Sequence, residues 1–103
     1  MDYIERIADM GACAPAMAWL RSEQHPTLQA AWDACPRSNW MLWLLAALGH
    51  PAYSDAQDAA ARDARAAARD ARAAVANAAY AAAYDAVRAA AVRAVVPVAP
   101  TLP

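Results

Sequence analysis

The fold is decided by residues 54–96, which read SDAQDAAARDARAAARDARAAVANAAYAAAYDAVRAAAVRAVV. This stretch contains neither glycine nor proline, and alanine, the strongest helix former, dominates it. Ser54 or Asp55 is a suitable N-cap, and the carboxylates of Asp55 and Asp58 are placed to complement the helix dipole. The stretch therefore predicts one long helix within residues 52–96, about 60 Å long at about 1.5 Å per residue.

Such a helix is about twice as long as a compact domain of 103 residues. It either projects and packs against a second copy of the chain, or it bends back near Asn77 so that its halves pack together. Residues 61–67 and 68–74 repeat the same heptad, ARDARAA, which favours a sustained seam between two helices. We therefore expect a homodimer, with a helix broken near Asn77 as the rival.

The larger apolar side chains lie mainly before Pro51, where glycine and proline divide the sequence into short segments. Four short helices are predicted. The first covers residues 2–10, and the second runs from Pro15 to the loop at 22–26. The third covers 28–34 after an N-cap at Thr27, and the fourth covers 40–48 after a cap at Ser38 or Asn39. The last of these is apolar nearly all round, which predicts burial. The expected core residues are Trp19, Trp32, Trp40, Trp43 and Leu44.

Together these segments predict an all-α fold in a single domain, 1–103. Short Trp-rich helices over residues 1–50 pack on the long Ala-rich helix over 52–96, and the Pro-rich residues 97–103 form an extended tail because proline ends a helix. A helical bundle of this kind is the expected architecture.

The long helix has a polar face on which arginines recur. Arg62, Arg65, Arg69 and Arg72 share it with interleaved aspartates, and Tyr80 and Tyr84 lie on about the same side. The leading interpretation is a solvated surface whose charges pair among themselves. The alternatives are a protein-binding face with Arg and Tyr as anchors, and contact with a nucleic-acid backbone.

No arrangement of residues predicts catalysis. His25 and His50 have no partner at metal-ligand spacing, and Cys13 and Cys35 lack the CxxC pattern. With two glycines in the chain, a phosphate-binding loop is hard to build. We expect no enzyme activity, no cofactor and no metal.

The net charge and the length of the apolar runs indicate where in the cell the protein is located. The net charge of −1 does not draw the chain to nucleic acid or to an anionic membrane. The start of the chain lacks a secretory signal, and the apolar run at 40–48 is about half of a membrane span. We expect a cytoplasmic protein in which Cys13 and Cys35 are reduced, with a disulfide between them as the alternative.

Most of the chain resembles the alanine-rich immunity-protein family of bacterial and phage genomes, and residues 11–48 carry the specificity of the match. The shared pattern is GACAPA at 11–16, then Trp19-Leu20, Thr27-Leu28, Trp32, Cys35, Arg37 and WMLWLL at 40–45, followed by an Ala/Tyr-rich stretch, Val92-Arg93 and a Pro-rich tail. The chain departs from it at Asn39, where Asp is commoner, and in being short.

The resemblance implies a helical, non-enzymatic inhibitor that covers the surface of a bacterial protein. A phage-encoded inhibitor of a defence protein, anti-CRISPR-like, is the leading hypothesis. The alternatives are an immunity protein that neutralises a toxin, and a helical protein that binds nucleic acid or belongs to a virion.

Overall fold

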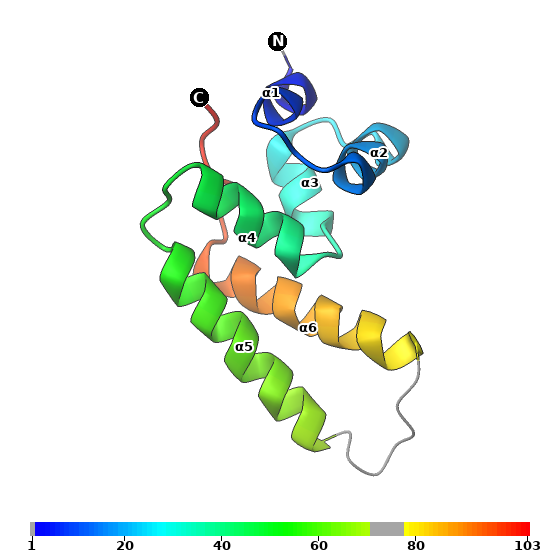
Figure 1. Cartoon of the computed structure of the whole chain (residues 1–103), viewed down its shortest axis with the longest axis vertical. Helices are drawn as coiled ribbons and strands as arrows, with labels where there is room; N and C mark the ends of the chain where they lie inside the picture. Colours follow the sequence, from blue (N-terminus) through cyan, green and yellow to red (C-terminus); the bar gives the residue numbers. More distant parts are fainter. Residues whose placement is uncertain (1, 71–77) are drawn as a thin grey trace.

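A computed structural model describes the backbone of residues 2–70 and 78–103, and the side chains of these residues except 67–70 and 78–82. Within these ranges every regular element is a helix and no strand occurs, so the all-α prediction is confirmed. The helices are α1 (Tyr3–Asp9), α2 (Ala14–Glu23), α3 (Leu28–Ala34), α4 (Ser38–Ala47), α5 (Tyr53–Asp70) and α6 (Ala78–Val95) (Figure 1).

Local capping fixes the starts of the first helices. Asp2 caps α1 by accepting a hydrogen bond from the amide of Glu5, at 2.9 Å. Thr27 caps α3, as predicted, by accepting from the amide of Ala30 at 3.1 Å. α4 is different, because no side chain of its own first turn caps it. The predicted cap at Ser38 or Asn39 is wrong, since Ser38 is already the first helical residue.

The prediction of one continuous long helix over 52–96 is wrong for the described residues, which match the rival in which two halves pack against each other. The range holds two helices, α5 and α6, which lie side by side and run in opposite directions (Figure 1). Buried alanines on α5, including Ala56 and Ala60, face the same hydrophobic cluster as Ala89 and Val92 on α6. Small side chains let two helix backbones approach closely, so the α5–α6 pair buries its alanine face within one chain. The expected break at Asn77 lies outside the described residues.

This correction bears on the predicted homodimer. The dimer was expected because a helix of about 60 Å would leave an alanine face uncovered. α6 covers that face on α5, with Ala56, Ala60 and Ala64 all buried. The geometric argument for the dimer is therefore lost, and the dimer itself stays a prediction.

The apolar interior consists of two clusters. The larger one joins Trp32, Cys35 and α4 to the α5–α6 pair, and it includes Met41, Leu44, Leu45 and Val92. The smaller one lies among α1, α2 and α3 and consists of Ile7, Met17, Leu20 and Ala31. Trp19 and Leu102 pack against both clusters. The N-terminal helices thus form a partly separate unit beside the rest of the fold.

The tail after α6 connects these two parts. Residues 97–103 are not helical, as predicted, and they run back toward α1 and α3 (Figure 1). The side chain of Gln29 on α3 donates to the carbonyl of Pro97 at 3.0 Å and accepts from the amide of Ala99 at 2.7 Å. The tail therefore fastens α3 to the end of α6. Among the helices described, none is both long and apolar enough to cross a membrane.

Candidate functional site

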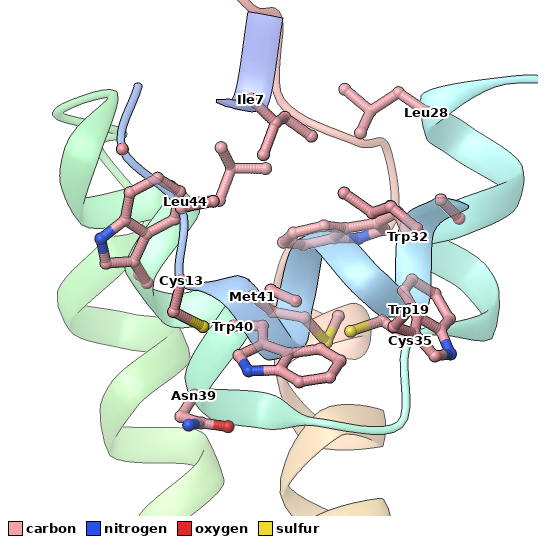
Figure 2. Close-up of a pocket in the computed structure, with 16 residues that line it drawn as sticks. Ile7, Cys13, Trp19, Leu28, Trp32, Cys35, Asn39, Trp40, Met41 and Leu44 are labelled. Carbon is pink, nitrogen blue, oxygen red and sulfur yellow. The ribbon is translucent and has the colours of Figure 1, made fainter. Parts of the chain in front are cut away.

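A cavity of about 290 Å³ lies among α1, α2, α3 and α4, where the two hydrophobic clusters meet (Figure 2). Its floor is made of buried side chains, which include Ile7, Leu20, Ala31, Trp32, Met41 and Leu44. Its rim is made of exposed residues, namely Gly11, Cys13, Asn39 and Trp43. The cavity therefore has an apolar interior and an opening to solvent.

Small residues explain why the cavity is not filled. Gly11, Ala12, Ala16 and Ala31 all line it, and none has a side chain longer than one methyl group. Close packing in a protein interior normally leaves few voids larger than a water molecule. These small side chains leave space beside the large indoles that also line the cavity.

The four tryptophans predicted as core have three different environments. Trp32 is 3% exposed, and its indole Nε1–H donates to the carbonyl of Val96 at 2.8 Å. Trp19 and Trp40 are half-buried, and their rings lie 6.0 Å apart between centroids at 46°. Trp43 is 36% exposed, so its assignment to the core is wrong. The reason is that α4 buries Met41, Leu44 and Leu45 and turns Trp43 outward.

None of the side chains that line the cavity is acidic or basic, and two of them are thiols. Cys35 is buried, and burial raises the pKa of its thiol. Cys13 is exposed at the rim. Asn39 adds an amide there, and Arg37 lies over the outside of the Trp40 ring at 5.4 Å. The polar groups thus lie at the opening and the apolar groups lie inside.

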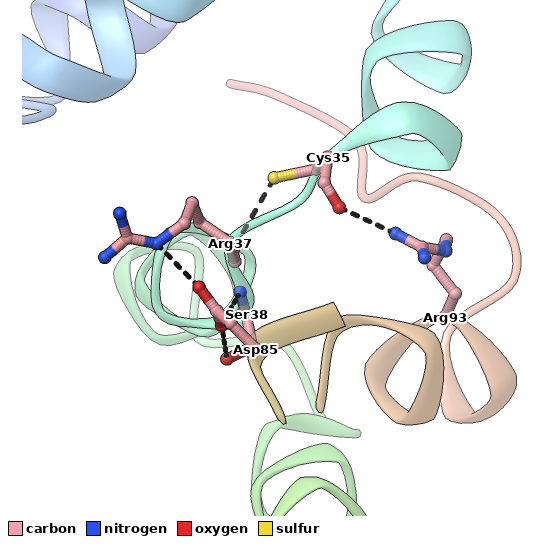
Figure 3. A network of polar contacts seen from close by, with 5 residues as sticks. All are labelled: Cys35, Arg37, Ser38, Asp85 and Arg93. Carbon is pink, nitrogen blue, oxygen red and sulfur yellow. Dashed lines mark hydrogen bonds and ion pairs between the residues drawn. The ribbon is translucent and has the colours of Figure 1, made fainter. Parts of the chain in front are cut away.

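A polar network anchors the loop before α4 to α6 (Figure 3). One carboxylate oxygen of Asp85 accepts hydrogen bonds from the amide and the hydroxyl of Ser38, at 3.0 and 2.8 Å. The other forms an ion pair with Nε of Arg37 at 2.6 Å. Arg93 donates to the carbonyl of Cys35 at 2.9 Å. Asp85 therefore supplies the N-cap that α4 lacks in its own sequence, and so positions the tryptophans of α4.

The sequence carries one signal for this role that was missed. Asp85 is the only acidic residue after Asp70, in a stretch otherwise dominated by alanine. A single carboxylate on an alanine-rich helix indicates a specific polar contact with another part of the same chain. The partner itself could not be identified, because Ser38 is 47 positions away along the chain.

The predicted arginine and tyrosine face is described only in part. Arg62 and Arg65 are exposed on α5 and line a shallow depression with Asp55, Asp58 and Val95. Tyr84 is half-buried on α6 and does not line that depression. The side chains of Arg69, Arg72 and Tyr80 lie outside the described residues. The arginines that are described lie beside carboxylates, which offset their charge.

The two histidines have separate structural positions. The ring of His50 accepts a hydrogen bond from the amide of Ala52 through Nδ1, at 3.1 Å. His25 packs against Trp19 with ring centroids 5.4 Å apart, and its carbonyl accepts from the hydroxyl of Tyr3 at 2.6 Å. Within the described ranges, His, Cys, Asp and Glu form no cluster that could hold a metal ion.

An uncharged cavity of this size, with a few polar groups at its opening, is suited to bind an apolar group. No family model, curated protein or solved structure matches the chain.

Proposed function

We propose that this chain is a non-enzymatic inhibitor that binds and blocks a bacterial protein, as its resemblance to the immunity-protein family implies. The observation that carries the proposal is the exposure of Trp43 beside an apolar cavity. Tryptophan is among the residues that contribute most to binding energy at protein interfaces, where it fills or borders desolvated pockets. An anti-CRISPR-like inhibitor carried by a phage remains our leading form of the proposal.

The surface around Trp43 supports this function better than the arginine face does. An apolar ring that is 36% exposed loses contact with water when a partner covers it, which favours association. Arg62 and Arg65 lie beside Asp55 and Asp58. A partner that approached these arginines would also meet the two carboxylates, which offset their charge. We therefore assign the interface to the end of the molecule that carries the cavity.

The proposal needs no cofactor and no catalytic group, because an inhibitor of this kind acts by covering a surface. The placement of the polar network around Asp85 also supports the proposal. Asp85 and Ser38 fix the start of α4, and α4 presents Trp43 to solvent on its outer side. Binding would then use a rigid helix rather than a loop, which lowers the entropy lost on association.

An affinity pull-down from a bacterial lysate tests the proposal, with the captured proteins identified by mass spectrometry. We expect wild type to retain one protein whose activity falls on binding, and Trp43→Ala to retain much less of it. Trp43→Ala should show the wild-type circular dichroism spectrum, so that a loss of capture reports on the interface. Equal capture by both proteins would overturn the assignment of the interface, and a lack of any inhibited partner would overturn the function.

Gel retardation separates the nucleic-acid alternative from this function. A shift of nucleic acid that weakens steeply with salt would favour that alternative. The protein-binding proposal expects no such shift, because the described arginines of α5 lie beside carboxylates.

A further inference from the structure

We propose that the cavity is a binding site for a small neutral molecule with two fused aromatic rings, of about the size of indole or naphthalene. This goes beyond the inhibitor function, because the ligand is a free small molecule and needs no protein partner. Four features carry the inference: the volume of the cavity, its lack of charge, its aromatic walls, and the polar groups confined to its opening.

The volume sets the size of the ligand. An engineered cavity of about 150 Å³, lined by aliphatic and aromatic side chains, stays dry and binds benzene. The cavity here measures about 290 Å³, close to twice that volume. A single ring would leave much of it empty and would forgo contacts with one wall. Two fused rings fill it.

The lining sets the charge of the ligand. The side chains of the floor have no ionised group, and the indole N–H of Trp32 is already bonded to the carbonyl of Val96. Arg37, the nearest charge at the outside of Trp40, is paired with Asp85 at 2.6 Å. An ionised ligand would lose its hydration without gaining a partner inside, which is costly. The ligand is therefore neutral.

The aromatic walls set its shape. Trp19 and Trp40 are tilted by 46° toward each other, and Trp32 forms part of the floor (Figure 2). Aromatic pairs prefer offset or edge-to-face contacts at centroid distances of about 4.5–7 Å. A flat ring system in the cavity lies beside this pair of indoles and over Trp32, where it can make contacts of both kinds. At the rim, the amide of Asn39 is placed to bond a single polar atom that the ligand leaves at the opening.

Titration of the full-length protein with indole, followed by nuclear magnetic resonance of the ¹⁵N-labelled chain, tests the site. We expect saturable shifts that centre on Trp19, Trp32 and Trp40. Indole-3-carboxylate, which has the same rings with a charge, should bind at least about tenfold more weakly. Absence of saturable shifts, or shifts that centre on α5, would overturn the proposal, and so would equal affinity for the charged analogue.

Two alanines of α2, one inside the cavity and one outside it, provide a matched pair of variants. Ala16 on α2 is buried and lines the cavity, so Ala16→Leu places a larger side chain in the space for the ligand. Its affinity for indole should fall at least about tenfold. Ala18 on the same helix is exposed and does not line the cavity, so Ala18→Leu should bind indole within about twofold of wild type. Unchanged affinity in Ala16→Leu would contradict the site.

Alkylation of Cys13, at the rim of the cavity, gives a second measurement that uses the wild-type protein alone. The thiol of Cys13 is exposed at the opening, whereas Cys35 is buried. Saturating indole should slow the alkylation of Cys13 by iodoacetamide in wild type at least several-fold. An unchanged rate would overturn the proposal even if Ala16→Leu failed to fold. Because capture of a protein partner is measured without indole, failure of this site and failure of the inhibitor function are distinguishable.

Discussion

Helices α1–α4 bury a few large side chains, whereas the α5–α6 pair buries many small ones. In the first region Trp32, Met41 and Leu44 supply most of the volume, and a cavity remains beside them. In the second region the buried residues of α5, among the side chains that the structure describes, are Ala56, Ala59, Ala60 and Ala64. Alanine buries little area, but its small side chain lets two helices pack closely.

The comparison shows which kind of packing leaves a cavity in which a ligand or partner can bind. Large rigid rings meet at a few points and leave gaps that no neighbouring methyl group fills, so the Trp-rich region has a cavity and an exposed indole. The described alanines of α5 are buried against α6, and the outer surface of α5 that the structure describes carries charged side chains. Our proposal is that binding occurs in the first region and that the second region positions it through Asp85.

Trp32→Ala should have the largest effect on stability. The indole is 3% exposed and bonds the carbonyl of Val96, so the change creates a void and leaves a buried carbonyl without its donor. The free energy of unfolding should fall by about 3–5 kcal/mol. Urea denaturation measures this loss of stability. Trp43→Ala is the control, and its loss should be less than half as large. Equal losses would mean that both indoles are core, as first predicted from the sequence.

Ala60→Leu tests the tight packing of the α5–α6 pair. Ala60 is buried against α6, and a larger side chain there forces the helices apart. We expect a loss of about 1–3 kcal/mol. Ala66→Leu on the exposed side of α5 should change stability by at most about 0.5 kcal/mol. Indistinguishable thermal midpoints for the two variants would show that the helices are not closely packed.

The sequence predicts the local features of this fold well, because they depend on neighbouring residues. The all-α class, the cap at Thr27 and the end of α3 before Pro36 follow from propensity and capping. The pairing of α5 with α6 does not, because alanine gives the same helix signal whether a helix is straight or folded back on itself. The exposure of Trp43 was missed for a related reason: α4 is apolar on every side, so periodicity could not show which face is buried.

The candidate site depends on long-range contacts and was harder to predict. Four cavity-lining tryptophans were singled out from the sequence, but as core residues rather than as walls. The role of Asp85 depends on its approach to Ser38 across 47 positions, which no local pattern encodes. The predicted arginine face includes Arg69, Arg72 and Tyr80, whose side chains lie outside the described residues.

Asp85→Ala tests the connection between the two regions. The change removes the N-cap of α4 and the ion pair with Arg37, whose side chain is 51% exposed. We expect a loss of about 1–2 kcal/mol, most of it from the cap, because an exposed ion pair contributes little. Asp63→Ala, at an exposed position of α5, is the control. A loss no larger than that of the control would show that α4 does not depend on α6 for its cap.

Cys35 predicts a small dependence of stability on pH. Burial raises the pKa of its thiol above the ordinary value of 9.0, so the folded protein holds this proton after the unfolded chain has released it. The contribution of Cys35 is therefore fully present below pH 9.0 and is lost as the pH rises toward the folded pKa. Denaturation between about pH 8 and about pH 10.5 measures the loss, with wild type compared against Cys35→Ala. A slope that is the same in both proteins would contradict the burial of this thiol.

The central claim is that binding belongs to the Trp-rich region and not to the arginine face. Once a partner has been captured, its affinity for Trp43→Ala and for the double variant Arg62→Ala, Arg65→Ala can be measured by calorimetry on the same day and in the same buffer. We predict that Trp43→Ala weakens binding about 30-fold, which corresponds to about 2 kcal/mol, and that the double variant stays within about threefold of wild type. A partner that tolerates Trp43→Ala but is lost with the two arginines would contradict the account.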